Sequence, residues 1–419
     1  MKAFRKFQSA LRENLSEWIR KIGEVDILVG IPSFNSEETV EEVVSVCALG
    51  LKEHFKEKRT AIIISDGGSL DDTRERANQA KLPVDVKRMV AIYRGMPGKG
   101  TSFRAIFEAA KLLKADCCVV VDSDLKSISP EWVKFLALPV LEKKANFVVP
   151  YYLRHKYDAS ITNHIVYPMT RALYGKQIRQ PIGGDFGFSG ELAAFYAGED
   201  VWQTDVAQFG IDIWMTTSAI NEGYSFLQAD LGTKIHETKD PSIDLGPMFR
   251  QVVSTLFFLM GKYEKNWMSV TKSQKIKTVG KVSQVPKLES VSVSLNKLKT
   301  EFVDGFHHFE PLYQQVLSHQ NFSELKGRVE NLEKKGELDF PVQLWAKIVY
   351  DFAFIYQTWS RNRRRLVDII TPLYFGKVGA FCQKVADMDS EGAEQVIEQE
   401  AQEFEKLKPY LVEKFKRWD

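Results

Sequence analysis

Val119-Val120-Val121-Asp122-Ser123-Asp124 is an apolar run that ends in two carboxylates separated by one serine. A short run of β-branched residues is typical of a buried strand at the centre of a parallel sheet. Open α/β sheets bind their ligands beyond the carboxyl ends of such strands. Two carboxylates at that position can share a divalent cation, because Mg²⁺ and Mn²⁺ prefer oxygen ligands and substrate phosphates. The stretch therefore predicts a charged site at the end of a central strand.

Strand and helix patterns alternate on both sides of this stretch. Further strands are predicted at 26–32, 61–65, 84–91, 147–150 and 225–231. Helices are predicted from the first strand to about His54, over 101–113 and over 161–173. This alternation is typical of a doubly wound parallel sheet that is covered by crossover helices.

A glycine-rich loop, Gly95-Met-Pro-Gly-Lys-Gly100, precedes the helix at 101–113. Its spacing fits neither the dinucleotide pattern Gly-x-Gly-x-x-Gly nor the P-loop pattern Gly-x4-Gly-Lys-Ser/Thr. Dehydrogenase and P-loop NTPase functions are therefore disfavoured. The loop is either a simple turn or a device that offers Lys99 to a nucleotide.

Three later residues are candidates for the same site. Asp185 follows Gly183 and Gly184, and successive glycines let the backbone approach a substrate closely. Asp212 falls in the first turn of a predicted helix, where an acid also interacts favourably with the helix dipole. His236 follows the strand at 225–231 and is a candidate metal ligand. Each of them also has a purely structural explanation: a turn, a helix end or an exposed histidine.

Size and composition limit the class of protein. The chain has 419 residues, which favours two domains, and its net charge of +2 argues against nucleic-acid binding by phosphate neutralisation. Cys117 and Cys118 are adjacent and cannot readily pair, so free thiols and a cytoplasmic location are expected. Residues 4–20 resemble an amphipathic helix and carry charges unlike those of a signal peptide, and no apolar run is long enough to span a membrane.

The chain changes character after about residue 245. A polar, lysine-rich stretch over 265–294 indicates a linker arm without convincing strands. Helical patterns then cover 295–318, 323–335, 342–361, 366–388 and 393–417. We therefore expect one domain over 1–262, and a linker arm with an all-helical domain over 263–419. A helical C-terminal domain of this kind often makes dimers, so a homodimer is expected.

These motifs together resemble the GT-A fold nucleotide-sugar glycosyltransferases. The resemblance rests on Ile31-Pro-Ser-Phe-Asn35, Ser65-Asp66-Gly-Gly-Ser69, Pro97-Gly-Lys-Gly100, Asp122-Ser-Asp124, Gln180-Pro-Ile-Gly-Gly-Asp185, Gly210-Ile-Asp212 and His236. The combination is similar to the retaining family that contains the glucosyl-3-phosphoglycerate, glucosylglycerate and mannosylglycerate synthases. It implies a Rossmann-like, doubly wound mixed sheet followed by a helical domain. It also implies hexose transfer to glycerate or 3-phosphoglycerate in the synthesis of compatible solutes, and a GDP- or UDP-hexose donor.

The resemblance assigns roles to individual residues. A divalent metal, Mg²⁺ or Mn²⁺, would be held by Asp124 and His236. Asp185 and Asp212 would lie at the reacting groups, and Arg154 and Arg179 would contact the acceptor. The nucleotide-sugar would be bordered by Pro32, Phe34, Glu37, Asp66, Lys99, Asp122, Gly183 and Gly184.

Other functions stay open on the sequence. An inverting family-2-like transferase acting on a polysaccharide or lipid would use Asp185 or Asp212 as its general base. A nucleotide-sugar pyrophosphorylase would use a similar sheet, and a non-catalytic scaffold would rely on the helical domain. The nucleotide base, the choice between glucose and mannose, and the phosphorylation of the acceptor are not specified by the sequence.

Overall fold

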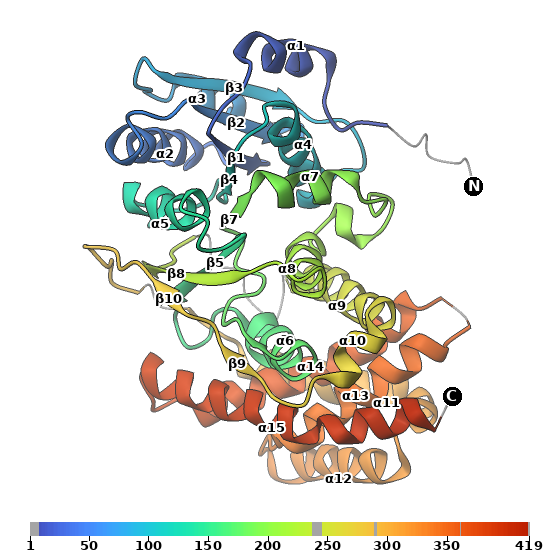
Figure 1. Cartoon of the computed structure of the whole chain (residues 1–419). Helices are drawn as coiled ribbons and strands as arrows, with labels where there is room; N and C mark the ends of the chain where they lie inside the picture. The colour runs from blue at the N-terminus through green and yellow to red at the C-terminus, as the bar shows by residue number, and fades with distance from the viewer. Residues whose placement is uncertain (1–7, 237–244, 289–290, 361, 418–419) are drawn as a thin grey trace. The chain divides into compact units, whose positions relative to one another are not determined.

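The computed structural model describes residues 8–236, 245–288, 291–360 and 362–417 (Figure 1). These residues form two compact units. The sheet unit consists of 8–153, 182–236 and 276–288, and the helical unit consists of 154–181, 245–275, 291–360 and 362–417. This division is interleaved along the chain and differs from the predicted single boundary at residue 262.

The sheet unit is built on an eight-stranded sheet with the order β10-β8-β5-β7-β4-β1-β2-β3. Its strands are β1 Ile27–Ser33, β2 Thr60–Asp66, β3 Val86–Ile92, β4 Cys117–Val120, β5 Phe147–Leu153, β7 Phe186–Ser189, β8 Phe226–Thr233 and β10 Thr278–Val279. β7 runs antiparallel to β4 and β5, whereas the other neighbours are parallel. β1, β2 and β4 are entirely buried, which explains their continuous apolar sequences. The predicted fold class, a doubly wound mixed sheet followed by a helical region, is confirmed.

Helices connect the strands of the sheet unit. They are α1 Glu13–Ile22, α2 Val40–His54, α3 Thr73–Gln79, α4 Lys99–Leu112, α5 Pro130–Leu141, α7 Gly190–Gly198, the 3₁₀ turn η2 Asp205–Ala207 and α8 Ile211–Asn221. The predicted N-terminal helix over 4–20 begins only at Glu13, and residues 1–7 lie outside the described part. Glu108 of α4 accepts hydrogen bonds from the Ser9 hydroxyl (2.5 Å) and the Ala10 amide (2.9 Å), which ties the preceding segment to α4.

The predicted linker arm completes the edge of the sheet. β10 pairs with β8, and Thr233 Oγ1 donates a hydrogen bond to the carbonyl of Pro286 (2.9 Å). Ser283 binds Glu131 through its amide (2.9 Å) and hydroxyl (3.0 Å). The sequence predicted only an extended arm here, because two-residue strands carry no recognisable period.

The helical unit contains most of the predicted C-terminal helices. Its elements are the π-helix η1 Thr162–Val166, α6 Tyr167–Tyr174, β6 Lys176–Gln177, α9 Leu245–Lys262, α10 Glu264–Ser269, β9 Gln274–Lys275, α11 Leu295–Val316, α12 His319–Lys335, α13 Val342–Thr358, α14 Arg364–Lys384 and α15 Ser390–Lys416. α6 packs against α15 and α9 packs against α14, so both belong to this unit although they precede residue 262. None of the described helices has the length and apolarity needed to cross a bilayer.

The four cysteines of the chain are Cys47, Cys117, Cys118 and Cys382. All of them are free and buried in the described structure, as the sequence predicted for thiols. Burial raises the pKa of the Cys382 thiol to about 12. These side chains therefore pack as small apolar groups.

Candidate active site

The candidate site lies where the strand order of the sheet changes direction. β2 and β3 follow β1 on one side, and β4 lies beside β1 on the other. Such a switch point opens a crevice beyond the carboxyl ends of the strands. The amide of Val121 still bonds to the carbonyl of Gly30 on β1 (3.1 Å), and the chain then leaves the sheet with Asp122. The central motif of the sequence therefore lies at this crevice.

Five charged residues of the sheet unit meet at this point, and we call them the charged cluster: Lys99, Asp122, Asp185, Asp212 and Lys234. Lys99 Nζ lies 2.7 Å from Asp122 Oδ1, and Lys234 Nζ lies 2.9 Å from Asp122 Oδ2. Each oxygen of the Asp122 carboxylate thus faces its own ammonium group. Lys234 also contacts Asp185 Oδ2 (2.7 Å), and Lys99 contacts Asp212 Oδ2 (3.4 Å).

The glycine-rich loop places Lys99 at the start of α4. A Cβ atom at Gly100 would lie 1.8 Å from the carbonyl oxygen of Val206, so only glycine fits against η2. The Tyr93 hydroxyl accepts a hydrogen bond from the Gly98 amide (2.9 Å) and donates one to the Gly98 carbonyl (3.2 Å). The loop is therefore a fixed support for Lys99.

Asp185 lies beneath Asp122 and is fully buried. Its Oδ1 accepts the amide hydrogen of Asp122 (2.8 Å). Its Oδ2 accepts hydrogen bonds from Lys234 (2.7 Å) and from the hydroxyl of Tyr152. Both carboxylate oxygens are thus occupied by protein donors. At the neighbouring Gly184, φ is +88° and a Cβ atom would lie 2.2 Å from Asp122 Oδ2.

The three acids of the charged cluster differ in the direction of their pKa shifts. Burial alone would raise the pKa of Asp122, but Lys234 and Lys99 hold it well below the ordinary value. Burial raises the pKa of Asp185, and the charge of Asp122 acts in the same direction. Burial also raises the pKa of Asp212, and Lys99 only partly offsets it. Asp122 is therefore the firmly ionised acid of the cluster.

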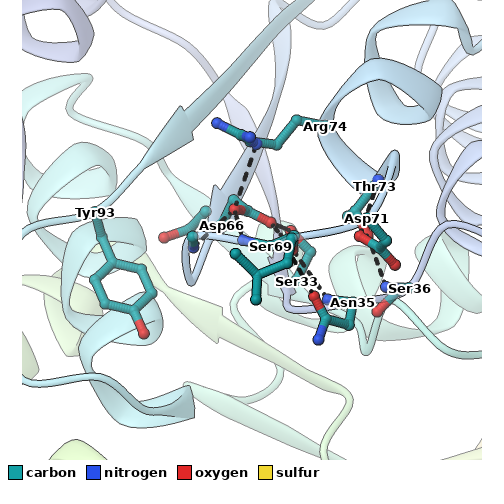
Figure 2. Close-up of polar contacts among 12 residues, drawn as sticks. Ser33, Asn35, Ser36, Asp66, Ser69, Asp71, Thr73, Arg74 and Tyr93 are labelled. Carbon is teal, nitrogen blue, oxygen red and sulfur yellow. Dashed lines mark hydrogen bonds and ion pairs between the residues drawn. The ribbon is translucent and has the colours of Figure 1, made fainter.

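A second polar arrangement follows β2 and is shown in Figure 2. The buried carboxylate of Asp66 accepts hydrogen bonds from the hydroxyls of Ser33 (2.9 Å) and Ser69 (2.6 Å) and from the amides of Gly68 and Ser69 (both 2.8 Å). Arg74 lies 3.8 Å from it. These contacts fix the loop after β2 against the end of β1.

The loop after β1 connects this arrangement to the central motif. Ser36 Oγ lies 2.9 Å from Ser123 Oγ, and the Thr39 hydroxyl donates to the Ser123 carbonyl (2.7 Å). Glu37 accepts a hydrogen bond from the Asp72 amide (2.9 Å). Phe34, two residues after Pro32, lies next to Gly67 and keeps 60% of its surface exposed. The loops after β1, β2 and β4 thus form one continuous rim.

Asp124 and His236 lie on neighbouring backbone segments. Leu125 and His236 form an antiparallel bridge, and the amide of Lys126 bonds to the carbonyl of Ile235 (2.9 Å). A carboxylate and an imidazole are a donor pair that fits Mg²⁺ or Mn²⁺ when substrate oxygens supply further ligands. Within the described ranges, no group of three or more His, Cys, Asp or Glu residues could hold a metal by itself.

The two predicted acceptor residues belong to the helical unit. Arg154 pairs with Asp158 (2.7 Å). Arg179 pairs with Glu394 through two contacts (2.5 and 2.8 Å) and donates to Asn163 (2.8 Å). The structure therefore gives both guanidinium groups partners inside their own unit.

Sequence reasoning missed two members of this site, Lys234 and Tyr152. Lys234 is largely buried and joins Asp122, Asp185 and the carbonyl of Gly183 (2.8 Å). The sequence feature that could have identified Lys234 was its position directly after β8 and two residues before His236. Tyr152 lies within β5, where an aromatic residue indicates only a strand.

Comparisons with known proteins identify similar sequences and structures. Residues 28–195 match the model of glycosyl transferase family 2. The glucosyl-3-phosphoglycerate synthase of Mycobacterium tuberculosis is 28% identical over 260 residues, covering 56% of this chain and 74% of the relative. The synthase of Petrotoga mobilis is 24% identical over 286 residues, covering 62% and 82%.

Among solved structures, the M. tuberculosis synthase in complex with Mn²⁺, uridine diphosphate and glucosyl-3-phosphoglycerate is similar, with a TM-score of 0.45. Its sequence is 23% identical, and the match covers 61% of this chain and 86% of the other. The resemblance expected from the motifs is confirmed by the family model and the sequence relatives. Residues 28–195 therefore match the model of glycosyl transferase family 2, and the chain is similar in sequence to glucosyl-3-phosphoglycerate synthases.

Proposed function

We propose that this protein is a metal-dependent glycosyltransferase that moves a hexose from a nucleoside-diphosphate sugar to glycerate or 3-phosphoglycerate. The observation that carries the proposal is the charged cluster, in which Lys99 and Lys234 each contact one oxygen of Asp122. Its place at the switch point of the sheet and the names of the sequence relatives support the same activity.

The nucleotide would bind along the rim formed by the loops after β1 and β2. The exposed ring of Phe34 offers an apolar face on which a base can stack. Asp66, which is held by Ser33 and Ser69, keeps the two loops in register beneath the base. Pro32 and Glu37 complete this border.

Asp124 and His236 would hold the metal. When bound there, the cation supplies electrostatic stabilisation of the charge that develops on the departing diphosphate. Lys99 adds a fixed positive charge beside the same group, and the glycine-rich loop keeps it in place. Asp122 would orient the ribose and the sugar, because its two lysine contacts fix the direction of its carboxylate.

Asp212 is the acid that we assign to the reacting hydroxyl. Its Oδ2 faces Lys99, whereas no donor among the described residues bonds to its buried Oδ1. An oxygen in that condition can accept a hydrogen bond from a substrate hydroxyl without breaking a protein contact. Burial raises the pKa of Asp212. In a transfer with retention this carboxyl would only orient the acceptor hydroxyl, whose proton would pass to the departing diphosphate.

Asp185 would act differently from our sequence-based expectation of a catalytic role. Its two oxygens receive the amide of Asp122, the ammonium of Lys234 and the hydroxyl of Tyr152. It would therefore position Lys234 and Asp122, with Gly183 and Gly184 leaving room for the sugar. Arg154 and Arg179 remain the proposed acceptor contacts, and an acceptor would have to compete there with Asp158 and Glu394.

The test is a matrix of donors and acceptors. UDP-glucose, GDP-glucose and GDP-mannose are each incubated with glycerate and 3-phosphoglycerate in Mn²⁺ or Mg²⁺, and nucleoside diphosphate release is followed. We expect release with at least one pair, dependent on both acceptor and metal. Donor hydrolysis that is indifferent to every acceptor, or no turnover of any donor, would overturn the proposal.

A further inference from the structure

The helical unit contains an open polar cavity of about 720 Å³. It lies between the segment 338–343, the C-terminal half of α14 and the middle of α15, all of which belong to this unit. Ligand sites for small molecules typically occupy about 300–1,000 Å³. The cavity is therefore large enough for a small metabolite.

A buried ion pair forms one wall of the cavity. Lys377 on α14 and Glu400 on α15 are 2% and 4% exposed, and Lys377 Nζ lies 2.5 Å from Glu400 Oε1. A buried ion pair is often no more stabilising than a pair of apolar side chains in its place, because desolvation offsets the attraction. An ammonium group has three hydrogen-bond donors, and Glu400 is the one acceptor for Lys377 among the described residues. The pair thus offers donor capacity to a ligand.

The pair is backed by a histidine on a π-helix, a form of helix that is frequent at functional sites. His164 Nδ1 lies 3.4 Å from Glu400 Oε2, and the ring packs edge-on against Phe381. The carbonyl of His164 accepts a hydrogen bond from Trp345 Nε1 (2.8 Å). Burial lowers the pKa of His164 and so disfavours its charged form.

The remaining lining carries amides and a balanced set of charges. Gln343 donates to Glu403 (3.1 Å), and Lys406 donates to the other oxygen of Glu403 (2.6 Å). Gln399 and Gln402 supply further amides on α15. The charged residues of the lining are Lys377, Lys384, Lys406, Asp339, Glu400 and Glu403, three of each sign. The apolar part of the wall includes Phe340 and Phe381.

We propose that this cavity is a second binding site, which takes an uncharged polyhydroxylated molecule such as a monosaccharide or disaccharide. Equal numbers of positive and negative groups give an anion no net attraction. Amide, ammonium and carboxylate groups can instead donate to and accept from neighbouring hydroxyls, while aromatic side chains contact the apolar face of a sugar ring. The site is separate from the residues assigned to transfer and does not depend on that assignment.

The experiment uses the full chain and saturation-transfer NMR with glucose, maltose and glycerol as probes, and inorganic phosphate as an anionic probe. The double variant Lys377→Met/Glu400→Met replaces the pair by apolar groups, and Gln399→Leu changes only the exposed rim. Lys326→Met is the matched control, because Lys326 is an exposed lysine paired with Glu310 elsewhere in this unit. We expect sugar binding in the wild type and in the control, and binding about tenfold weaker in Gln399→Leu.

Each outcome decides the proposal. Binding that survives in Asp124→Ala but weakens in Gln399→Leu places the sugar in this cavity, even where the double variant does not fold. Binding that is lost in Asp124→Ala and unchanged in Gln399→Leu assigns it to the transfer site and overturns the proposal. Absence of sugar binding, or a response to phosphate alone, also overturns it. The transfer assay is run in parallel and reports independently on the proposed function.

Discussion

Gly184, beside the charged cluster, cannot be replaced by a larger residue without a structural change. Its φ of +88° disfavours other residues, and a Cβ atom would collide with Asp122 Oδ2. We predict that Gly184→Ala displaces Asp122, lowers kcat/KM at least tenfold and costs about 1–3 kcal/mol of stability. Gly198→Ala is the matched control, because nothing lies within 4 Å of a Cβ atom there. Equal activity of the two variants would contradict this reading.

The ammonium group of Lys234 pairs with two acids, the partly buried Asp122 and the fully buried Asp185. Lys234→Met leaves them facing each other, and removal of one partner from a buried ion pair costs roughly 3–5 kcal/mol. We predict that Asp185→Asn recovers part of this loss when it is combined with Lys234→Met, because one uncompensated charge disappears. Urea unfolding of the two single variants and the double variant measures the coupling. Strictly additive effects would show that the two residues do not interact.

Asp66 and Asp122 could be named from the sequence because they lie at the ends of predicted strands, and parallel strands end at one edge. Lys99, Asp185 and Asp212 were named from a glycine-rich loop, a pair of glycines and the first turn of a predicted helix. What the sequence could not indicate is which donor each acid receives. Asp185 was expected to face substrate, yet its neighbours are Tyr152 from β5 and Lys234 from directly after β8, which no local pattern connects to it.

At the scale of elements, the ion pair between α14 and α15 makes stability depend on pH. Lys377 and His164 outweigh the effect of burial and lower the pKa of Glu400 from 4.5 to about 2. A depressed acid pKa stabilises the fold above pH 4.5, and this contribution disappears as the pH falls towards 2. The size of the effect is roughly 3 kcal/mol.

We therefore predict a loss of unfolding free energy between pH 4.5 and 2 that Glu400→Gln reduces. Urea unfolding at several pH values, followed by circular dichroism, measures the slope. Lys326→Met serves as a control for a lysine at an exposed pair. The same slope in wild type and Glu400→Gln would show that Glu400 is not the titrating group.

Long elements whose apolar residues recur with a clear period were predicted well, whereas short elements were not. The central strands and the helices α11 to α15 have continuous apolar or helical patterns. β7 was not predicted as a strand, because it has only four residues and includes Gly187 between two phenylalanines. β9 and β10 are too short to show alternation, and their pairing depends on distant strands.

At the scale of the whole molecule, each unit draws on separate stretches of chain. Residues 154–181 and 245–275 belong to the helical unit, and 276–288 returns to the sheet unit with β10. A fragment of residues 1–262 would therefore contain helices without their partners α14 and α15, and a sheet without its edge strand. We predict that it aggregates or unfolds without a cooperative transition. Thermal circular dichroism and sedimentation test this, and a cooperative transition near that of the full chain would contradict it.

The most direct test of the central claim is proton NMR of the product made from a glucose nucleotide donor with glycerate or 3-phosphoglycerate. The account predicts a new anomeric signal of α configuration, as in the donor, which appears only with metal and acceptor present. Asp124→Ala, which loses the proposed metal carboxylate, should remain folded and give no such signal. A β-configured product would contradict retention and favour the inverting alternative, and the same product signal from Asp124→Ala would contradict the proposed metal site.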